Sequence, residues 1–151
     1  MRIQQLSELL EYIADCRLSM GKLYGRLHRN ADSARVKLML EYFQQHEKHV
    51  HDTLIDYIDG APKRMLDTWF KHVVFEDFLK RCEQTILPAS MTEDQVLELH
   101  LSLEHRLLTL LEKTANSCAT NEIKSALQDL VRVAKTQQQR LVHSSLRMDD
   151  I

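Results

Sequence analysis

The stretch from Phe43 to Leu54, FQQHEKHVHDTL, constrains the fold of this chain more than any other. Apolar residues three and four positions apart predict a helix with one buried stripe, formed by Val36, Leu40, Phe43, Val50, Leu54 and Tyr57. The same spacing places Glu47 on this stripe, facing the protein interior. Because a buried carboxylate loses its hydration at a large cost in free energy, the fold must supply Glu47 with a buried partner.

The composition indicates an all-helical protein with a single helical-bundle domain over residues 1–151. The chain is 44% hydrophobic but has only 3 glycines and 2 prolines, which indicates few turns and long helices. The formal net charge of -2 arises from mixed signs, and no apolar run reaches the ~20 residues of a membrane-spanning helix. We therefore expect neither a nucleic-acid partner nor a membrane.

The cysteines favour a cytoplasmic location. Cys16, Cys82 and Cys118 are an odd number at wide spacing, and no C-x-x-C pair occurs. Reduced thiols in a cytosol are the expected state of such residues.

The first half of the chain predicts a helical hairpin over residues 3–59. Its first helix, about residues 3–28, has an apolar residue at every seventh position: Leu6, Ile13, Met20 and Leu27. A polar break follows, where Asp32 or Ser33 can cap the second helix. Because this connection is short, the two helices are expected to be antiparallel neighbours.

A second hairpin is predicted over residues 93–146, after a crossover helix at about 63–88. Thr92 and Gln95 fit a capping box at its start, and a polar break at 116–120 separates its two helices. Two hairpins joined by a connection of this length form a four-helix bundle with one long crossover.

The crossover helix holds large apolar residues, among them Trp69, Phe70, Val73, Val74 and Phe78. Because these residues would occupy more than one helix face, we predict that this helix forms a homodimer interface, with Trp69 or Phe70 near its centre. The alternative is that the surface groove of the bundle covers both faces.

The two halves of the chain match at an offset of 87 residues: Leu10 aligns with Leu97, Met20 with Leu107, Leu23 with Leu110, Val36 with Ile123, Leu40 with Leu127 and Leu54 with Leu141. Any two amphipathic hairpins of equal length can be placed in such a register, so the apolar matches alone do not establish a repeat. Two polar positions add to them, because Arg17 aligns with Glu104 and Glu47 with Ala134. Each half thus places one acid on its seam.

These residues resemble the rubrerythrin-like and ferritin-like proteins. FQQHEKHVHDTL is similar to the family's second-helix motif, in which a Glu is followed three positions later by a His. Arg17 lies seven residues before Tyr24, as the family's bridging Glu lies seven residues before an aromatic residue. The resemblance covers about residues 6–58 and 93–145 and implies a ferritin-like four-helix bundle.

The resemblance also implies a di-iron site, with one Glu from the first and third helices and a Glu-x-x-His from the second and fourth. Two ligand positions keep their carboxylates, Glu47 and Glu104, and the other four hold Arg17, Val50, Ala134 and Gln137. A cation and two aliphatic side chains do not bind iron. We therefore expect a degenerate site with no metal and no cofactor.

Arg17 is the expected partner of Glu47. Placed between Glu47 and Glu104, its guanidinium would supply the positive charge that the metal supplies in the family. Gln137 can hydrogen-bond either carboxylate. In the alternative interpretation, Arg17 extends to solvent and Glu47 lies at the edge of the stripe.

The 8 histidines raise a separate metal hypothesis. His46 and His49 share a helix face and could bind zinc together with Cys16, which lies at a similar height in the hairpin. This is the minor alternative, because most such histidines are solvated or satisfy local polar groups. His100 falls on a seam position, as a hydrogen-bonded core residue or a neighbour of Glu104.

The leading function is non-enzymatic: a ferritin-like bundle that acts through self-association or another protein partner. Two alternatives stay open. One is a residual metal-binding protein or oxidoreductase of the rubrerythrin or ferritin type. The other is a binder of small apolar ligands in a chamber around Val50 and Ala134. Resemblance in fold does not decide among them.

Overall fold

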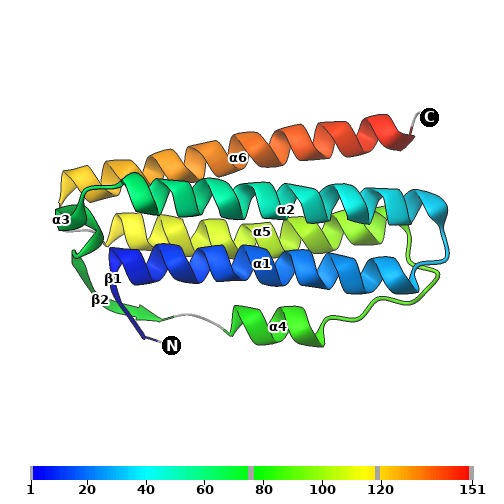
Figure 1. Ribbon diagram of the computed structural model, residues 1–151, viewed down its shortest axis with the longest axis horizontal. Helices are drawn as coiled ribbons and strands as arrows, with labels where there is room; N and C mark the ends of the chain where they lie inside the picture. Colours follow the sequence, from blue (N-terminus) through cyan, green and yellow to red (C-terminus); the bar gives the residue numbers. More distant parts are fainter. Residues whose placement is uncertain (1, 75–76, 118–119, 150–151) are drawn as a thin grey trace. The chain divides into compact units, whose positions relative to one another are not determined.

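The computed structural model describes residues 2–74, 77–117 and 120–149, with side chains described within 5–70, 77–117 and 120–144. The chain divides into two compact units, residues 1–92 and 93–151 (Figure 1). None of the helices in the described residues combines the length and apolarity that crossing a membrane requires. The single domain expected over the whole chain stays a prediction.

The first unit is built on a hairpin of two long helices, α1 (Leu6–Asn30) and α2 (Ala34–Gly60), which run antiparallel in Figure 1. The apolar residues predicted to face inward are buried: Leu6, Ile13, Met20, Leu27, Val36, Leu40, Phe43 and Leu54. Ser33 caps α2, because its hydroxyl accepts a hydrogen bond from the N–H of Val36 at 3.3 Å. The predicted hairpin and its break are confirmed.

The predicted start of the first helix at residue 3 is wrong. Residues Arg2–Gln5 form a strand, β1, which pairs antiparallel with β2 (Trp69–Val74), Gln5 lying opposite Trp69. Leu6, the first residue of α1, donates its N–H to the carbonyl of Thr68 at 3.0 Å. The backbone next to β2 thus satisfies an amide that the start of a helix leaves without an intrahelical acceptor.

The predicted continuous helix over residues 63–88 is also wrong, because this segment contains α3 (Lys63–Leu66), β2 and α4 (Phe78–Gln84). The strand has the sequence WFKHVV, which is rich in the aromatic and β-branched residues that favour strands. Trp69 is exposed and Phe70 is buried, as the two-residue alternation of a strand requires. Apolar residues that would fill several faces of a helix are therefore divided between a strand and a short helix.

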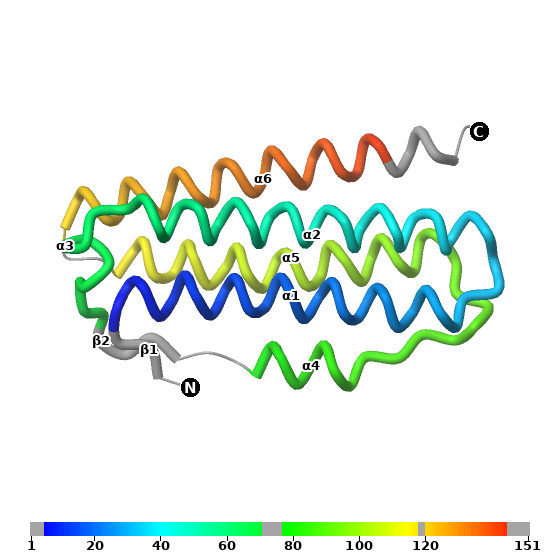
Figure 2. The backbone as a smooth tube through the Cα atoms, in the orientation of Figure 1, coloured from blue at the N-terminus to red at the C-terminus, as the bar shows by residue number. Residues whose placement is uncertain are grey.

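Helix α4 packs along α1, as the backbone trace shows (Figure 2). Its residues Phe78 and Cys82 are buried. Arg26 of α1 donates from Nη2 to the carbonyls of Cys82 and Thr85, both at 2.9 Å. These carbonyls lie at the C-terminal end of α4, where acceptors lack intrahelical partners, so Arg26 fixes that end to α1.

The second unit is the predicted hairpin of α5 (Glu93–Asn116) and α6 (Asn121–Asp149). Both helices bury an apolar seam, which includes Val96, Leu103, Leu107, Leu111, Ile123, Leu127, Val131 and Leu141. The start of α5 at residue 93 is 87 positions after that of α1 at residue 6, and the start of α6 at residue 121 is 87 positions after that of α2 at residue 34. The helix starts of the two units therefore follow the offset found in the sequence.

Candidate functional site

Arg17 and Glu47 form a buried ion pair between α1 and α2. Nη1 of Arg17 lies 3.2 Å from Oε2 of Glu47 and 3.5 Å from Oε1. Arg17 is 3% exposed and Glu47 is 0% exposed, so solvent screens neither charge. The predicted pairing is confirmed, and the alternative in which Arg17 extends to solvent is wrong.

The ion pair lies within the apolar seam of this hairpin. Gly21, one turn after Arg17, lies against α2, because a Cβ at that position would be in van der Waals contact with the Cβ of Glu47, at 3.9 Å. Further along the seam, Tyr24 and Phe43 pack edge to face, with ring centroids 5.8 Å apart. Apolar packing therefore continues beside the two charges.

The chemistry of the pair follows from its donors and acceptors. The guanidinium of Arg17 stays protonated and only donates hydrogen bonds, and it carries a permanent positive charge. Burial of two ions has a large desolvation cost, which their attraction and hydrogen bonds must offset. The arrangement can hold a fixed pair of charges in the core, but Arg17 cannot exchange a proton near neutral pH.

A second buried polar cluster lies where α4 meets α1, and the sequence analysis did not predict it. Cys16 and Cys82 are free thiols, 0% and 2% exposed, and Tyr12 is buried beside Cys16. Burial raises the pKa of Cys16 to about 12, and burial followed by the Glu47 carboxylate raises the pKa of Cys82 to about 12. Thiols with such pKa values stay protonated and react slowly near neutral pH. The one signal in the sequence was the placement of Tyr12 and Cys16 one turn apart on the seam of α1.

The remaining positions of the predicted polar core are buried or half-buried: Val50, Glu104, Ala134 and Gln137. His100 is completely buried on α5, one turn before Glu104, as its seam position predicted. That Arg17 also pairs with Glu104, and that Gln137 hydrogen-bonds one of the two carboxylates, stays a prediction.

The structure places the three residues of the zinc alternative in different environments, and this alternative stays a prediction. Cys16 is buried on the side of α1 that meets α4, whereas His46 is half-buried and His49 is exposed. In the described part of the first unit, no three His, Cys, Asp or Glu side chains lie within ligating reach of one another.

The predicted interface residues divide into exposed and buried ones. Trp69 is 63% exposed, whereas Phe70 and Phe78 are buried. The side chains of Val73 and Val74 lie outside the described residues. Phe70 and Phe78 are buried within the chain, and their place at an interface between chains stays a prediction. Trp69 stays a candidate.

Comparisons with known proteins give a structural match only. No family model matches the sequence, and no curated protein matches it. The structure is similar to the crystal structure of a protein from Thermotoga maritima, which is described as a candidate ferritin-like diiron-carboxylate protein. The similarity covers 96% of this chain and 97% of that chain, with a TM-score of 0.59 and 14% sequence identity. At this identity the match concerns the fold alone.

Proposed function

We propose that this chain acts without catalysis, through contacts with other protein chains. It is an all-α protein with the ferritin-like fold, in which two helical hairpins are joined by a long crossover. The buried ion pair of Arg17 and Glu47, at 3.2 Å, carries this proposal. In the sequence resemblance, Arg17 stands where the family has a bridging glutamate. A core arginine at that position removes a ligand and adds a positive charge.

The residues at the family's ligand positions do not fit a di-iron centre. Iron in such a site is held by carboxylate and imidazole groups, whereas a guanidinium only donates hydrogen bonds. Val50 and Ala134, at two further ligand positions, present only hydrocarbon. The positive charge of Arg17 balances Glu47 as a cation would, but it has no redox chemistry.

Metal analysis tests this part of the proposal. Protein purified from iron-supplemented cells should contain well under one iron per chain and show no absorption of an oxo-bridged di-iron centre. The Glu47→Gln variant serves as the control, because iron that it leaves unchanged is bound elsewhere on the protein. Stoichiometric iron in the wild type, lost in Glu47→Gln, contradicts the proposal.

The exposed Trp69 supports self-association as the form of protein contact. Its side chain is 63% exposed on β2, beside the backbone pairing with β1. Tryptophan is enriched in protein interfaces because it contributes a large apolar area and one hydrogen-bond donor. Among soluble proteins that self-associate, a dimer with two-fold symmetry is the commonest arrangement.

Sedimentation tests this second part. The wild type should be a dimer at tens of micromolar, and Trp69→Glu should be a monomer. Ile86→Glu is the matched control, because Ile86 is an apolar residue of the same crossover that is 85% exposed. A wild type that is monomeric at this concentration refutes self-association, and equal loss of the dimer in both variants refutes a specific role for Trp69.

A further inference from the structure

A groove between α5 and α6 lies within the second unit, and the proposed function does not use it. Its volume is about 570 Å³, and its walls include His105 and Leu108 from α5 and Lys135, Gln138, Val142 and His143 from α6. Pockets of ~300–1,000 Å³ are the usual size for small organic ligands. The groove is therefore large enough for such a molecule.

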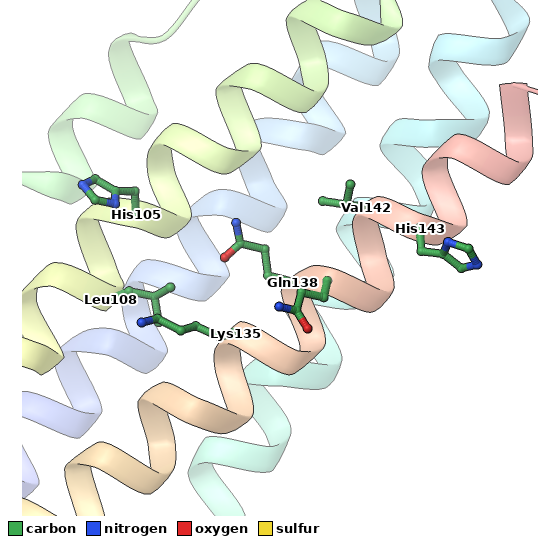
Figure 3. Close-up of a pocket in the computed structure, with 7 residues that line it drawn as sticks. His105, Leu108, Lys135, Gln138, Val142 and His143 are labelled. Atoms are coloured by element: carbon green, nitrogen blue, oxygen red, sulfur yellow. The ribbon is translucent and has the colours of Figure 1, made fainter.

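The walls combine an apolar surface with hydrogen-bond donors. In Figure 3, Leu108 lies on α5, and Lys135, Gln138 and Val142 follow one another along α6. Among the described residues that line the groove, none carries a carboxylate. The lining groups with a charge or a strong donor are an ammonium, amides and imidazoles, which suit an anionic head group.

The ammonium of Lys135 has a competing partner on the opposite helix. Nζ of Lys135 lies 3.0 Å from Oε1 of Glu112, and both side chains are about half exposed. An exposed ion pair of this kind contributes little free energy. The carboxylate of a ligand can therefore share the Lys135 ammonium with Glu112, or replace Glu112, at little cost. Glu112 thus holds the ammonium at the groove and also competes with a ligand.

The two histidines do not turn the groove into a metal site. His105 and His143 lie far apart in Figure 3, on either side of the other labelled residues. Ligands of one metal ion must converge on a point. The imidazoles therefore contribute polar walls at separate ends of the groove.

We propose that the groove between α5 and α6 binds a small organic anion with an apolar body, such as a medium-chain fatty acid. The hydrocarbon chain packs on Val142 and on the small exposed edge of Leu108, which removes apolar surface from water. The carboxylate accepts hydrogen bonds from Lys135 and a neighbouring glutamine amide. The proposal is independent of the Arg17–Glu47 pair.

Isothermal titration calorimetry with decanoate, below its micelle concentration, tests the proposal on the 151-residue chain. Lys135→Gln should lower the affinity about two- to fivefold, because it removes a partly exposed ion pair with the ligand. Glu112→Gln should raise the affinity, because it removes the competing carboxylate. The opposite directions of these two effects distinguish head-group recognition from unspecific apolar binding.

Two controls make the test specific. Arg132→Gln removes another exposed, ion-paired cation from α6, one that does not line the groove, and should leave the affinity unchanged. Decylamine has the same chain length with a positive head group and should bind more weakly than decanoate. The proposal is overturned if decanoate shows no saturable binding, if Lys135→Gln binds it as the wild type does, or if decylamine binds equally well.

Discussion

At the scale of single residues, Arg17 and Glu47 depend on each other because both are out of reach of water. Their ion pair contrasts with that of Arg132 and Asp129, whose side chains are 75% and 63% exposed. Removing one partner of a buried pair leaves an uncompensated charge in the core, whereas water solvates the remaining partner of an exposed pair. Burial therefore decides how much each arginine matters for stability.

We predict that Arg17→Ala lowers the free energy of unfolding by about 3–5 kcal/mol, because Glu47 loses its counter-charge. The double variant Arg17→Met/Glu47→Leu should cost less than Arg17→Ala, because it removes both charges. The control, Arg132→Ala, should change stability by about 0–1 kcal/mol. Urea denaturation measures all three, and a near-neutral Arg17→Ala would contradict the buried pair.

At the scale of elements, α4 depends on α1 for its structure. It has 7 residues, and isolated helices shorter than about 12 residues are marginal in water. Its buried residues and the two hydrogen bonds from Arg26 attach it to α1. Because few contacts hold it, α4 belongs to the parts of the fold that open locally at the lowest free energy.

We predict that Arg26→Ala speeds the alkylation of Cys82 about tenfold, because it removes two charge-assisted hydrogen bonds that hold α4 closed. In the wild type, alkylation by iodoacetamide at pH 8 should be slow, because burial raises the pKa of this thiol to about 12. Mass spectrometry of tryptic peptides follows the reaction. Arg29→Ala, which removes an exposed arginine of the same helix, is the control. Equal rates in Arg26→Ala and Arg29→Ala would show that Arg26 does not hold α4.

At the scale of the whole molecule, the chain uses one helical plan twice. Each unit contains a hairpin of two long helices, and the helix starts at residues 6 and 34 recur at 93 and 121. The seam positions of the two hairpins differ in charge, because Arg17 corresponds to Glu104 and Glu47 to Ala134. The two hairpins therefore share a backbone pattern but not a set of polar residues.

We predict that residues 6–58 superpose on residues 93–145 in an experimental structure, with Arg17 over Glu104 and Glu47 over Ala134. The physical reason is that the helices of both hairpins start at positions 87 residues apart, which places the seams at the same heights in both hairpins. A crystal structure measures this directly. A best superposition at any other offset would rule out the internal repeat.

Local periodicity determined the two hairpins and the buried position of Glu47, and the resemblance to the ferritin-like proteins then identified Arg17 as its partner. A spacing of three and four decides which side chains share a helix face, and a short connection places the two faces together. The charge rule then required a cation opposite Glu47. The sequence therefore sufficed where the interacting residues lie on adjacent helices of one hairpin.

Only the tertiary structure decided the crossover and the cluster around α4. The segment WFKHVV becomes a strand because Arg2–Gln5, far earlier in the chain, provide its backbone partners. The same pairing exposes Trp69 and buries Phe70. After the strand, the short helix α4 places Cys82 near Cys16. A local apolar pattern cannot identify a partner so distant, because a strand forms only when another strand satisfies its hydrogen bonds.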